Sequence, residues 1–250
     1  KPNWQDLTAL SRKDIEKYLS WHYSHTKNLK SAHFKYLFCI RGFLEYIQIA
    51  QYPESPEVPV NQLLLKEDIP KTPGYSEDDV KYIPEGVIEQ LDDHLNKLSP
   101  KYIPIIILLR ATGWRISDIL NLKYDTCIER TQQGWYICGD IIKTQILNHR
   151  VPITDEVAAV VQAVIEEMRT KSTSENNPKK YLFVRFDGRR KGYPPWQGTI
   201  RRALNSLARQ CNIVDGKGRI FKFKNHAFRH TKAIELINNG MRLVHVQKWM

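Results

Sequence analysis

The chain has 250 residues, enough for one large domain or two modest ones that each bury a core. Its 38 Lys and Arg residues exceed its 27 Asp and Glu residues, giving a formal charge of +11 at pH 7. This charge favours a polyanionic partner, with nucleic acid ahead of acidic membrane surfaces. Because no apolar run reaches the length of a membrane span and no signal peptide opens the chain, we expect no membrane partner and a cytoplasmic protein.

Two helices are predicted within the first fifty residues. Ser11 followed by Asp14 is a helix N-cap signal, and Leu10 and Ile15 occupy the positions of a hydrophobic staple. The second helix is predicted over residues 29–50. Its apolar side would be formed by Leu37, Phe38, Leu44 and Ile47.

Repeated prolines between residues 53 and 79 predict an extended linker, because proline interrupts regular structure. We therefore divide the chain into three parts. These are a helical DNA-binding domain over 1–55, a proline-rich linker over 56–79 and a catalytic-size domain over 80–250. The chain begins at Lys1 and ends inside a helical pattern, so we interpret both domains as truncated.

The large domain is predicted to be mainly α with a small antiparallel β-sheet, an α+β fold. One helix is expected over 84–98 and another from Pro100 to Gly113, kinked or delayed by Pro104. Close spacing predicts an antiparallel meander of Trp135–Cys138, Asp140–Lys143 and Arg150–Ile153. A further strand is expected over 181–186, and further helices over 155–170, 198–211, 226–238 and after Gly240.

Two isolated basic residues are candidates for holding an anion. Arg115 follows a helix-ending glycine, and Asp118 three positions later can orient its guanidinium, leaving part of the fork for an anion. A surface ion pair of little energetic value is the competing interpretation. Lys143 is expected at a hairpin tip, where it can reach into a groove, although a solvated lysine would look the same.

His226 and Arg229 are three residues apart, so on a helix they share a face and can touch one phosphate. His230 lies one step round the helix. A capping histidine beside a surface arginine is the alternative. No Cys or acidic partner lies at metal-ligand spacing, the four cysteines form no CxxC pair, and no GxGxxG, Walker or GxSxG motif is present. We therefore expect reduced thiols, no metal and no cofactor.

Basic residues interleaved with aromatic residues are typical of a surface that binds the DNA backbone, although such charges can also form a solvated face. The candidates are Lys27, Lys30, Arg41, Arg189, Arg190, Arg201, Arg202, Lys222 and Lys224.

Taken together and in this order, these motifs resemble those of the tyrosine recombinases, the family of phage integrases and mobile-element transposases. The resemblance extends from about Tyr82 to the end and is carried by three patches. They are Thr112-Gly113-Trp114-Arg115 with Asp118 and Leu122, Lys143-Thr144 with Val151-Pro152, and His226 with Arg229, His230 and Thr231. The resemblance implies a two-domain, C-shaped DNA clamp. The preceding helical region is similar, more weakly, to the family's core-binding domain.

Two departures from the family pattern stand out. Asp118 occupies a position where the family more often has glutamate. The family's second His or Trp and its tyrosine nucleophile follow a helix that aligns with residues 243–250, and none of the twelve tyrosines here occupies that place. We therefore expect the nucleophile to be absent from this chain, which would bind DNA without cleaving it, whereas the parent protein would be an enzyme.

The resemblance implies site-specific DNA recombination, by integration, transposition or excision, through a 3′-phosphotyrosyl intermediate and without metal. Arg115 and Arg229 would clamp the scissile phosphate, Lys143 would protonate the leaving 5′-oxygen, and His226 would bind the phosphate or help to take the tyrosine proton. Asp118 and His230 would support them. The implied partners are double-stranded DNA at specific sites, a homo-tetramer on two duplexes, and accessory recombination proteins.

Three other functions remain open from the sequence. A non-catalytic DNA-binding regulator would tolerate loss of Arg115 with only weaker binding. A type IB topoisomerase would relax any supercoiled plasmid. An RNA-binding protein is the least favoured, since no RNA-binding motif is present.

Overall fold

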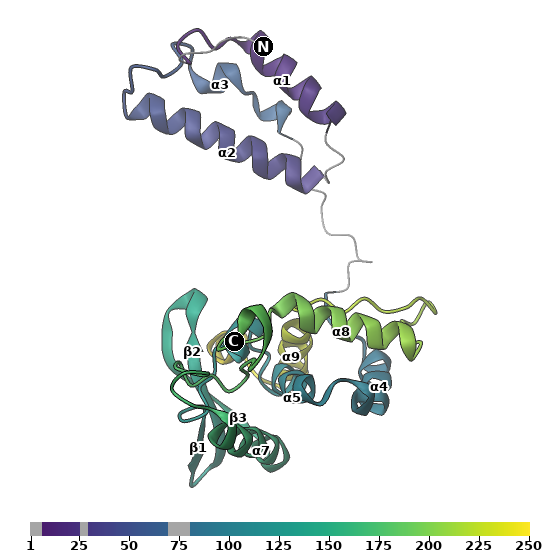
Figure 1. Cartoon of the computed structure of the whole chain (residues 1–250). Coiled ribbons are helices and arrows are strands. Elements are labelled where there is room, and N and C mark those ends of the chain that lie inside the picture. Colours follow the sequence, from purple (N-terminus) through teal and green to yellow (C-terminus); the bar gives the residue numbers. More distant parts are fainter. Residues whose placement is uncertain (1–6, 26–29, 70–80) are drawn as a thin grey trace. The chain divides into compact units, whose positions relative to one another are not determined.

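The computed structural model describes residues 7–25, 30–69 and 81–250. The chain divides into two compact units, Lys1–Asp79 and Val80–Met250 (Figure 1). Each unit has its own hydrophobic core. Among the described helices, none combines the length and the apolar character needed to cross a membrane.

The first unit is built from two long helices and a returning segment. Its elements are α1 (Arg12–His25), α2 (Lys30–Ile49), the short α3 (Val60–Leu63) and a 3₁₀ turn, Lys66–Asp68. The backbone N–H of Ser11 donates to the Asp14 carboxylate at 3.2 Å, and Leu10 and Ile15 are both buried, so the predicted cap and staple are confirmed.

Two predictions for the first unit are wrong. Phe38 is 62% exposed, so it does not belong to the apolar side of α2. Residues 56–69 are not an extended linker, because Val60 and Leu63 are buried in the core of this unit. The side-chain amide of Gln48 donates to the carbonyls of Pro56 and Val58 at 2.7 and 2.8 Å. The prolines therefore do not prevent this segment from packing. The rest of the expected linker, residues 70–79, lies outside the described residues.

The second unit is mainly helical. Its helices are α4 (Glu85–His94), α5 (Ile103–Thr112), α6 (Ile116–Leu120), α7 (Asp155–Lys171), α8 (Gln197–Gln210), α9 (Ala227–Asn238) and α10 (Leu243–Trp249). Helix α5 is almost wholly buried and packs against α6, α7 and α9. Pro104 lies in its first turn, where the missing N–H costs no helical hydrogen bond. Gly113 ends the helix at φ +67°, as predicted.

A three-stranded antiparallel sheet flanks these helices, in the order β1 (Ile128–Thr131), β2 (Gly134–Ile141), β3 (Ile146–Ile153). The predicted meander is therefore corrected, because residues 135–138 and 140–141 form one strand and β1 precedes them. Lys143 lies in a 3₁₀ turn, Ile142–Thr144, between β2 and β3. The fold class, mainly α with a small antiparallel sheet, is confirmed.

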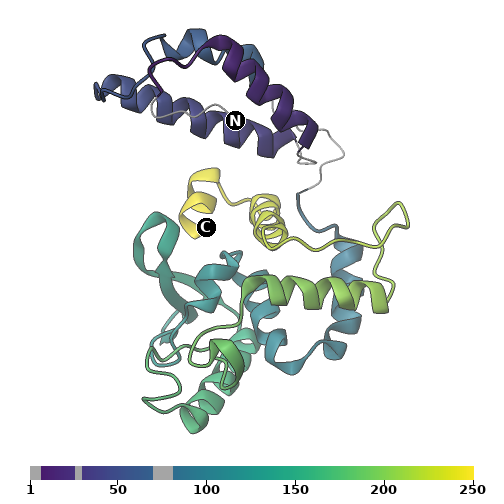
Figure 2. The same ribbon diagram turned by 45° about the horizontal axis from the view of Figure 1, so that its top comes forward.

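The strand expected over residues 181–186 does not form. This segment makes only isolated bridges, Lys123 with Tyr181 and Arg185 with Lys191. Leu182 and Phe183 are buried against the core, so the apolar run reflects packing and not a sheet ladder. Helix α8 crosses in front of α5, and α10 lies near the β2–β3 hairpin (Figure 2).

Candidate active site

Arg115 lies directly before α6, at the turn that follows α5. Its side chain is 19% exposed and that of Asp118 is 1% exposed. Arg115 Nη1 and Asp118 Oδ2 are 3.8 Å apart, too far for a hydrogen bond, and neither atom has a hydrogen-bond partner among the described residues. A buried guanidinium N–H without a partner costs stability unless an anion satisfies it. Arg115 is therefore arranged to receive one.

Arg229 lies in the first turn of α9, and its Nη1 donates to the carbonyl of Gly113 at 3.3 Å. Burial, and then the positive charge of Arg115, lowers the pKa of the Arg229 guanidinium, while Asp118 acts in the opposite direction. The two guanidiniums are thus close enough to repel each other. An arginine remains charged at neutral pH, so the pair forms a concentrated positive site.

Asp118 is the point where three elements meet. Burial raises the pKa of its carboxyl, against the opposing charges of Arg115 and Arg229. The backbone N–H of Ile142, in the hairpin turn, also lowers the pKa of this carboxyl. Asp118 of α6 therefore lies near the turn that contains Lys143. Lys143 itself is exposed in this turn.

His226 immediately precedes α9 and is exposed, as is His230 one turn later. Partial burial of the ring, and then the nearby charges of Lys81, His226 and Arg229, lower the pKa of His230. Both histidines therefore lie at the same helix N-terminus as Arg229, where backbone N–H groups favour an anion.

Most of the predicted DNA-binding residues lie on the surface of the second unit. Those exposed there are Arg189, Arg190, Arg201, Arg202, Lys222 and Lys224. In the first unit, Arg41 pairs with Glu45 at 2.7 Å within α2, so part of its charge is already neutralised. Lys27 lies outside the described residues, as does the side chain of Lys30.

The turn that carries Arg115 is held by residues that sequence reasoning missed. The indole Nε1 of Trp249 donates to the carbonyl of Thr112 at 2.9 Å. His149 Nε2 donates to the Trp249 carbonyl at 2.9 Å, and its ring packs on the fully buried Trp114 with centroids 5.4 Å apart. These contacts join α10 and β3 to the turn, and only the abundance of tryptophan near the motifs could have suggested them.

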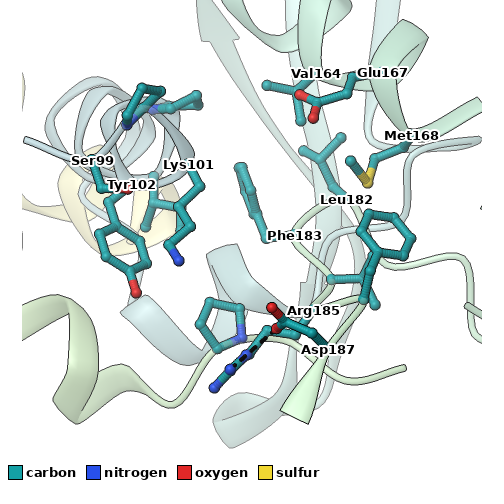
Figure 3. A pocket seen from close by; sticks show the side chains of 16 residues that line it. Ser99, Lys101, Tyr102, Val164, Glu167, Met168, Leu182, Phe183, Arg185 and Asp187 are labelled. Carbon is teal, nitrogen blue, oxygen red and sulfur yellow. Dashed lines mark hydrogen bonds and ion pairs between the residues drawn. The ribbon is translucent and has the colours of Figure 1, made fainter. Parts of the chain in front are cut away.

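The candidate site is distinct from one cavity of the second unit. A cavity of about 520 Å³ lies elsewhere in the second unit, between the start of α5, α7 and the segment around Phe183 (Figure 3). Lys101 and the Arg185–Asp187 ion pair flank it, and no predicted site residue lines it. Within the described ranges, no group of three or more His, Cys, Asp or Glu side chains could hold a metal ion.

Comparison with known proteins finds similarity to integrases, transposases and tyrosine recombinases. Residues 81–250 match the family described as "Phage integrase family". Transposase B of transposon Tn554 from Staphylococcus aureus is 38% identical over 199 residues, which cover 79% of this chain and 29% of that protein. The tyrosine recombinase XerC of Staphylococcus epidermidis is 28% identical over 174 residues, covering 67% of this chain and 53% of the relative. The chain thus spans less than a third of the length of the Tn554 transposase.

A solved structure of the XerH site-specific recombinase bound to its difH substrate shares the fold. It has a TM-score of 0.70 at 17% identity and covers 98% of this chain and 64% of that one. The family match extends over most of the chain and includes the Arg115 turn, the Lys143 hairpin and the start of α9. The chain therefore belongs to the phage integrase family of tyrosine recombinases.

Proposed function

We propose that this chain binds a specific recombination site in double-stranded DNA and activates one phosphodiester of it for cleavage and rejoining. The observation that carries the proposal is the convergence of Arg115 and Arg229 beside a buried carboxylate, with Nη1 of Arg115 lacking a hydrogen-bond partner among the described residues. Two fixed guanidiniums offer several N–H donors to the non-bridging oxygens of one phosphate.

In the proposed reaction a tyrosine oxygen attacks the scissile phosphorus and the bond to the 5′-oxygen breaks. Negative charge accumulates on the non-bridging oxygens in the transition state, where Arg115 and Arg229 stabilise it. Lys143 gives a proton to the leaving 5′-oxygen, and His226 binds the phosphate or takes the tyrosine proton. A 5′-hydroxyl of a partner duplex then attacks the phosphotyrosyl link, so the bond is restored without a nucleotide cofactor.

The proposed substrate is the recombination site of a mobile element, which is supported by the similarity to a Tn554 transposase. We further propose that four copies act on two duplexes and that accessory recombination proteins take part. A similar solved structure, a lambda integrase tetramer bound to a Holliday junction, supports the first part. Asp118 and His230 would orient the catalytic groups without touching the phosphate.

Covalent trapping tests this proposal. The protein expressed in its full reading frame, and the 250-residue chain beside it, would be mixed with a nicked duplex carrying the element's end. A denaturing gel that shows a protein–DNA adduct with the full reading frame would support it. Tight, salt-dependent binding without any adduct would favour the DNA-binding regulator instead.

The two arginines provide a sharper prediction. Arg115→Ala and Arg229→Ala should each lower the rate of adduct formation by about 10²–10³-fold, because each removes a donor to the transition-state oxyanions. Arg209→Ala, on the exposed end of α8, serves as the control and should leave the rate within a few-fold of the wild type. Normal rates in both site variants would exclude the proposed clamp.

A further inference from the structure

A shallow hollow of about 260 Å³ lies beside the candidate active site. Ser117 and Asn121 of α6 contribute to its lining, as does Ile142 of the hairpin turn. Tyr193 and Trp196 contribute from the segment that leads into α8. None of these five residues has a part in the proposed chemistry.

Two of the aromatic side chains that line the hollow are exposed. Tyr193 is 51% exposed and Trp196 is 54% exposed. The Trp196 ring nevertheless rests on the first turn of α8, because a Cβ added at Gly198 would lie only 2.5 Å from it. The indole can lie there because Gly198 has no side chain. The Trp196 ring is therefore held against α8, and its exposed surface remains accessible to a ligand.

Positive charge surrounds this ring. The Arg202 guanidinium carbon is 5.8 Å from the Trp196 ring centroid, and Arg202 Nε donates to the carbonyl of Gly198 at 3.3 Å. Arg190, which also lines the hollow, is exposed. An aromatic ring flanked by cations is the arrangement with which proteins stack a nucleobase and hold the phosphate attached to it.

The position of the hollow relates it to the scissile phosphate. Ser117 is two residues beyond Arg115, and Ile142 immediately precedes Lys143. A phosphate held by Arg115 would therefore have its adjoining nucleotide within reach of the hollow, since successive nucleotides of one strand rise only about 3.4 Å.

We propose that this hollow binds one unpaired nucleobase of the cleaved strand, next to the scissile phosphate, by stacking on Trp196 and Tyr193. The proposal rests on the proposed recombination function. Rejoining to a partner duplex requires the 5′-hydroxyl end to leave its complementary strand, so the bases beside it must unpair. Stacking on an indole offsets part of the lost base stacking and accepts any base.

Photo-cross-linking of the 250-residue chain locates the base. The probe is a synthetic nicked duplex with one 5-iodouracil beside the nick, in either an unpaired or a paired form. Irradiation followed by peptide mass spectrometry should give an adduct at Trp196 or Tyr193 with the unpaired probe and little with the paired one. Adducts only at other residues, or equal yields from both probes, would overturn the proposal.

Binding measurements provide the energetic test. Wild-type chain should bind the unpaired probe more tightly than the paired one, and Trp196→Ala should reduce this preference by about 5- to 100-fold. Gly198→Ala should act in the same direction because it displaces the indole. Trp21→Ala is the matched control, since Trp21 is 55% exposed in the first unit, and it should leave the ratio unchanged. Circular dichroism would verify that each variant is folded.

Three outcomes separate the hypotheses. A ratio unchanged by Trp196→Ala contradicts the base site, whatever the effect on affinity. If Trp196→Ala instead alters sedimentation with the ratio unchanged, the hollow receives a side chain of a second copy. Failure of the phosphate clamp itself would appear separately, as equal affinity of Arg115→Ala and wild type for both probes.

Discussion

The buried carboxyl group of Asp118 orients the candidate site without stabilising the folded state at neutral pH. Burial raises the pKa of its carboxyl in spite of two nearby arginines. A raised pKa in the folded state means that the ionised form is less favourable there than in the unfolded chain. The contribution of the Asp118 carboxyl group to the free energy of unfolding is then fully present below its unfolded-state pKa. This contribution is lost as the pH rises through its folded-state pKa. At neutral pH the carboxylate therefore contributes orientation and not stability.

Asp118→Asn tests this interpretation. We expect its free energy of unfolding at pH 7, measured by urea denaturation, to equal or exceed that of the wild type, and the difference to shrink as the pH falls towards 4. Adduct formation by the protein in its full reading frame should nevertheless decrease, because the amide no longer orients the two guanidiniums. Asp93→Asn, on the exposed side of α4, is the control. A loss of roughly 3–5 kcal/mol would instead indicate a stabilising buried ion pair.

At the scale of elements, the Arg115 turn is supported from α9, α10 and β3 at once. Arg229 reaches the Gly113 carbonyl, Trp249 reaches the Thr112 carbonyl, and His149 holds Trp249. A side chain on Gly113 would meet Lys232 Cβ at 2.8 Å as well as require an unfavourable φ. The turn is therefore fixed by tertiary contacts rather than by its own sequence.

Trp249→Phe removes one hydrogen-bond donor and keeps most of the ring. We expect the free energy of unfolding to fall by about 1 kcal/mol. We also expect the amides of α10 to exchange with solvent faster in the variant than in the wild type, by a larger factor than the amides of α5. Hydrogen exchange read by mass spectrometry would measure both effects. Trp135→Phe in β2 is the control, because the ring of Trp135 lies under Arg130 and away from α10. Unchanged exchange in α10 would show that this hydrogen bond does not anchor the helix.

Local signals predicted the elements that local chemistry determines. The Ser11–Asp14 cap, the glycine that ends α5 and the helices from α7 onward were all expected from sequence. Strand β1 was missed because Ile128–Thr131 is short and charged, and it exists through pairing with β2. The segment around Leu182 was misassigned because burial and strand pairing give the same apolar run.

The candidate site could be predicted from the sequence to about the same extent as the helices and strands. Motif order identified Arg115, Asp118, Lys143 and Arg229, and the structure brings the two arginines close to the carboxyl group of Asp118. Three features depend on contacts between distant parts of the chain. They are the effect of the Ile142 N–H on the pKa of Asp118, the Trp249 hydrogen bond and the Trp196 hollow. No spacing along the sequence encodes such contacts.

At the scale of the whole molecule, a charge of +11 should make the proposed binding to DNA strongly dependent on salt. Lys222 and Lys224 are exposed just before α9 and its arginine. If both contact phosphates, the double variant Lys222→Gln/Lys224→Gln should lower the slope of log affinity against log salt by about 2.

Titration of binding against sodium chloride measures this slope. Lys171→Gln is the control, because Lys171 already pairs with Glu167 at 2.8 Å and should change the slope little. An unaltered slope in the double variant would place the DNA backbone elsewhere on the second unit.

The 3.8 Å separation between Arg115 Nη1 and Asp118 Oδ2 has an evolutionary consequence. Glutamate has one more carbon than aspartate, so at this position its carboxylate could reach the guanidinium and form the hydrogen bond that aspartate does not make. That bond would occupy an N–H that Arg115 otherwise leaves for an anion. The length of the acidic side chain and the position of Arg115 should therefore diverge together among descendants of a common ancestor.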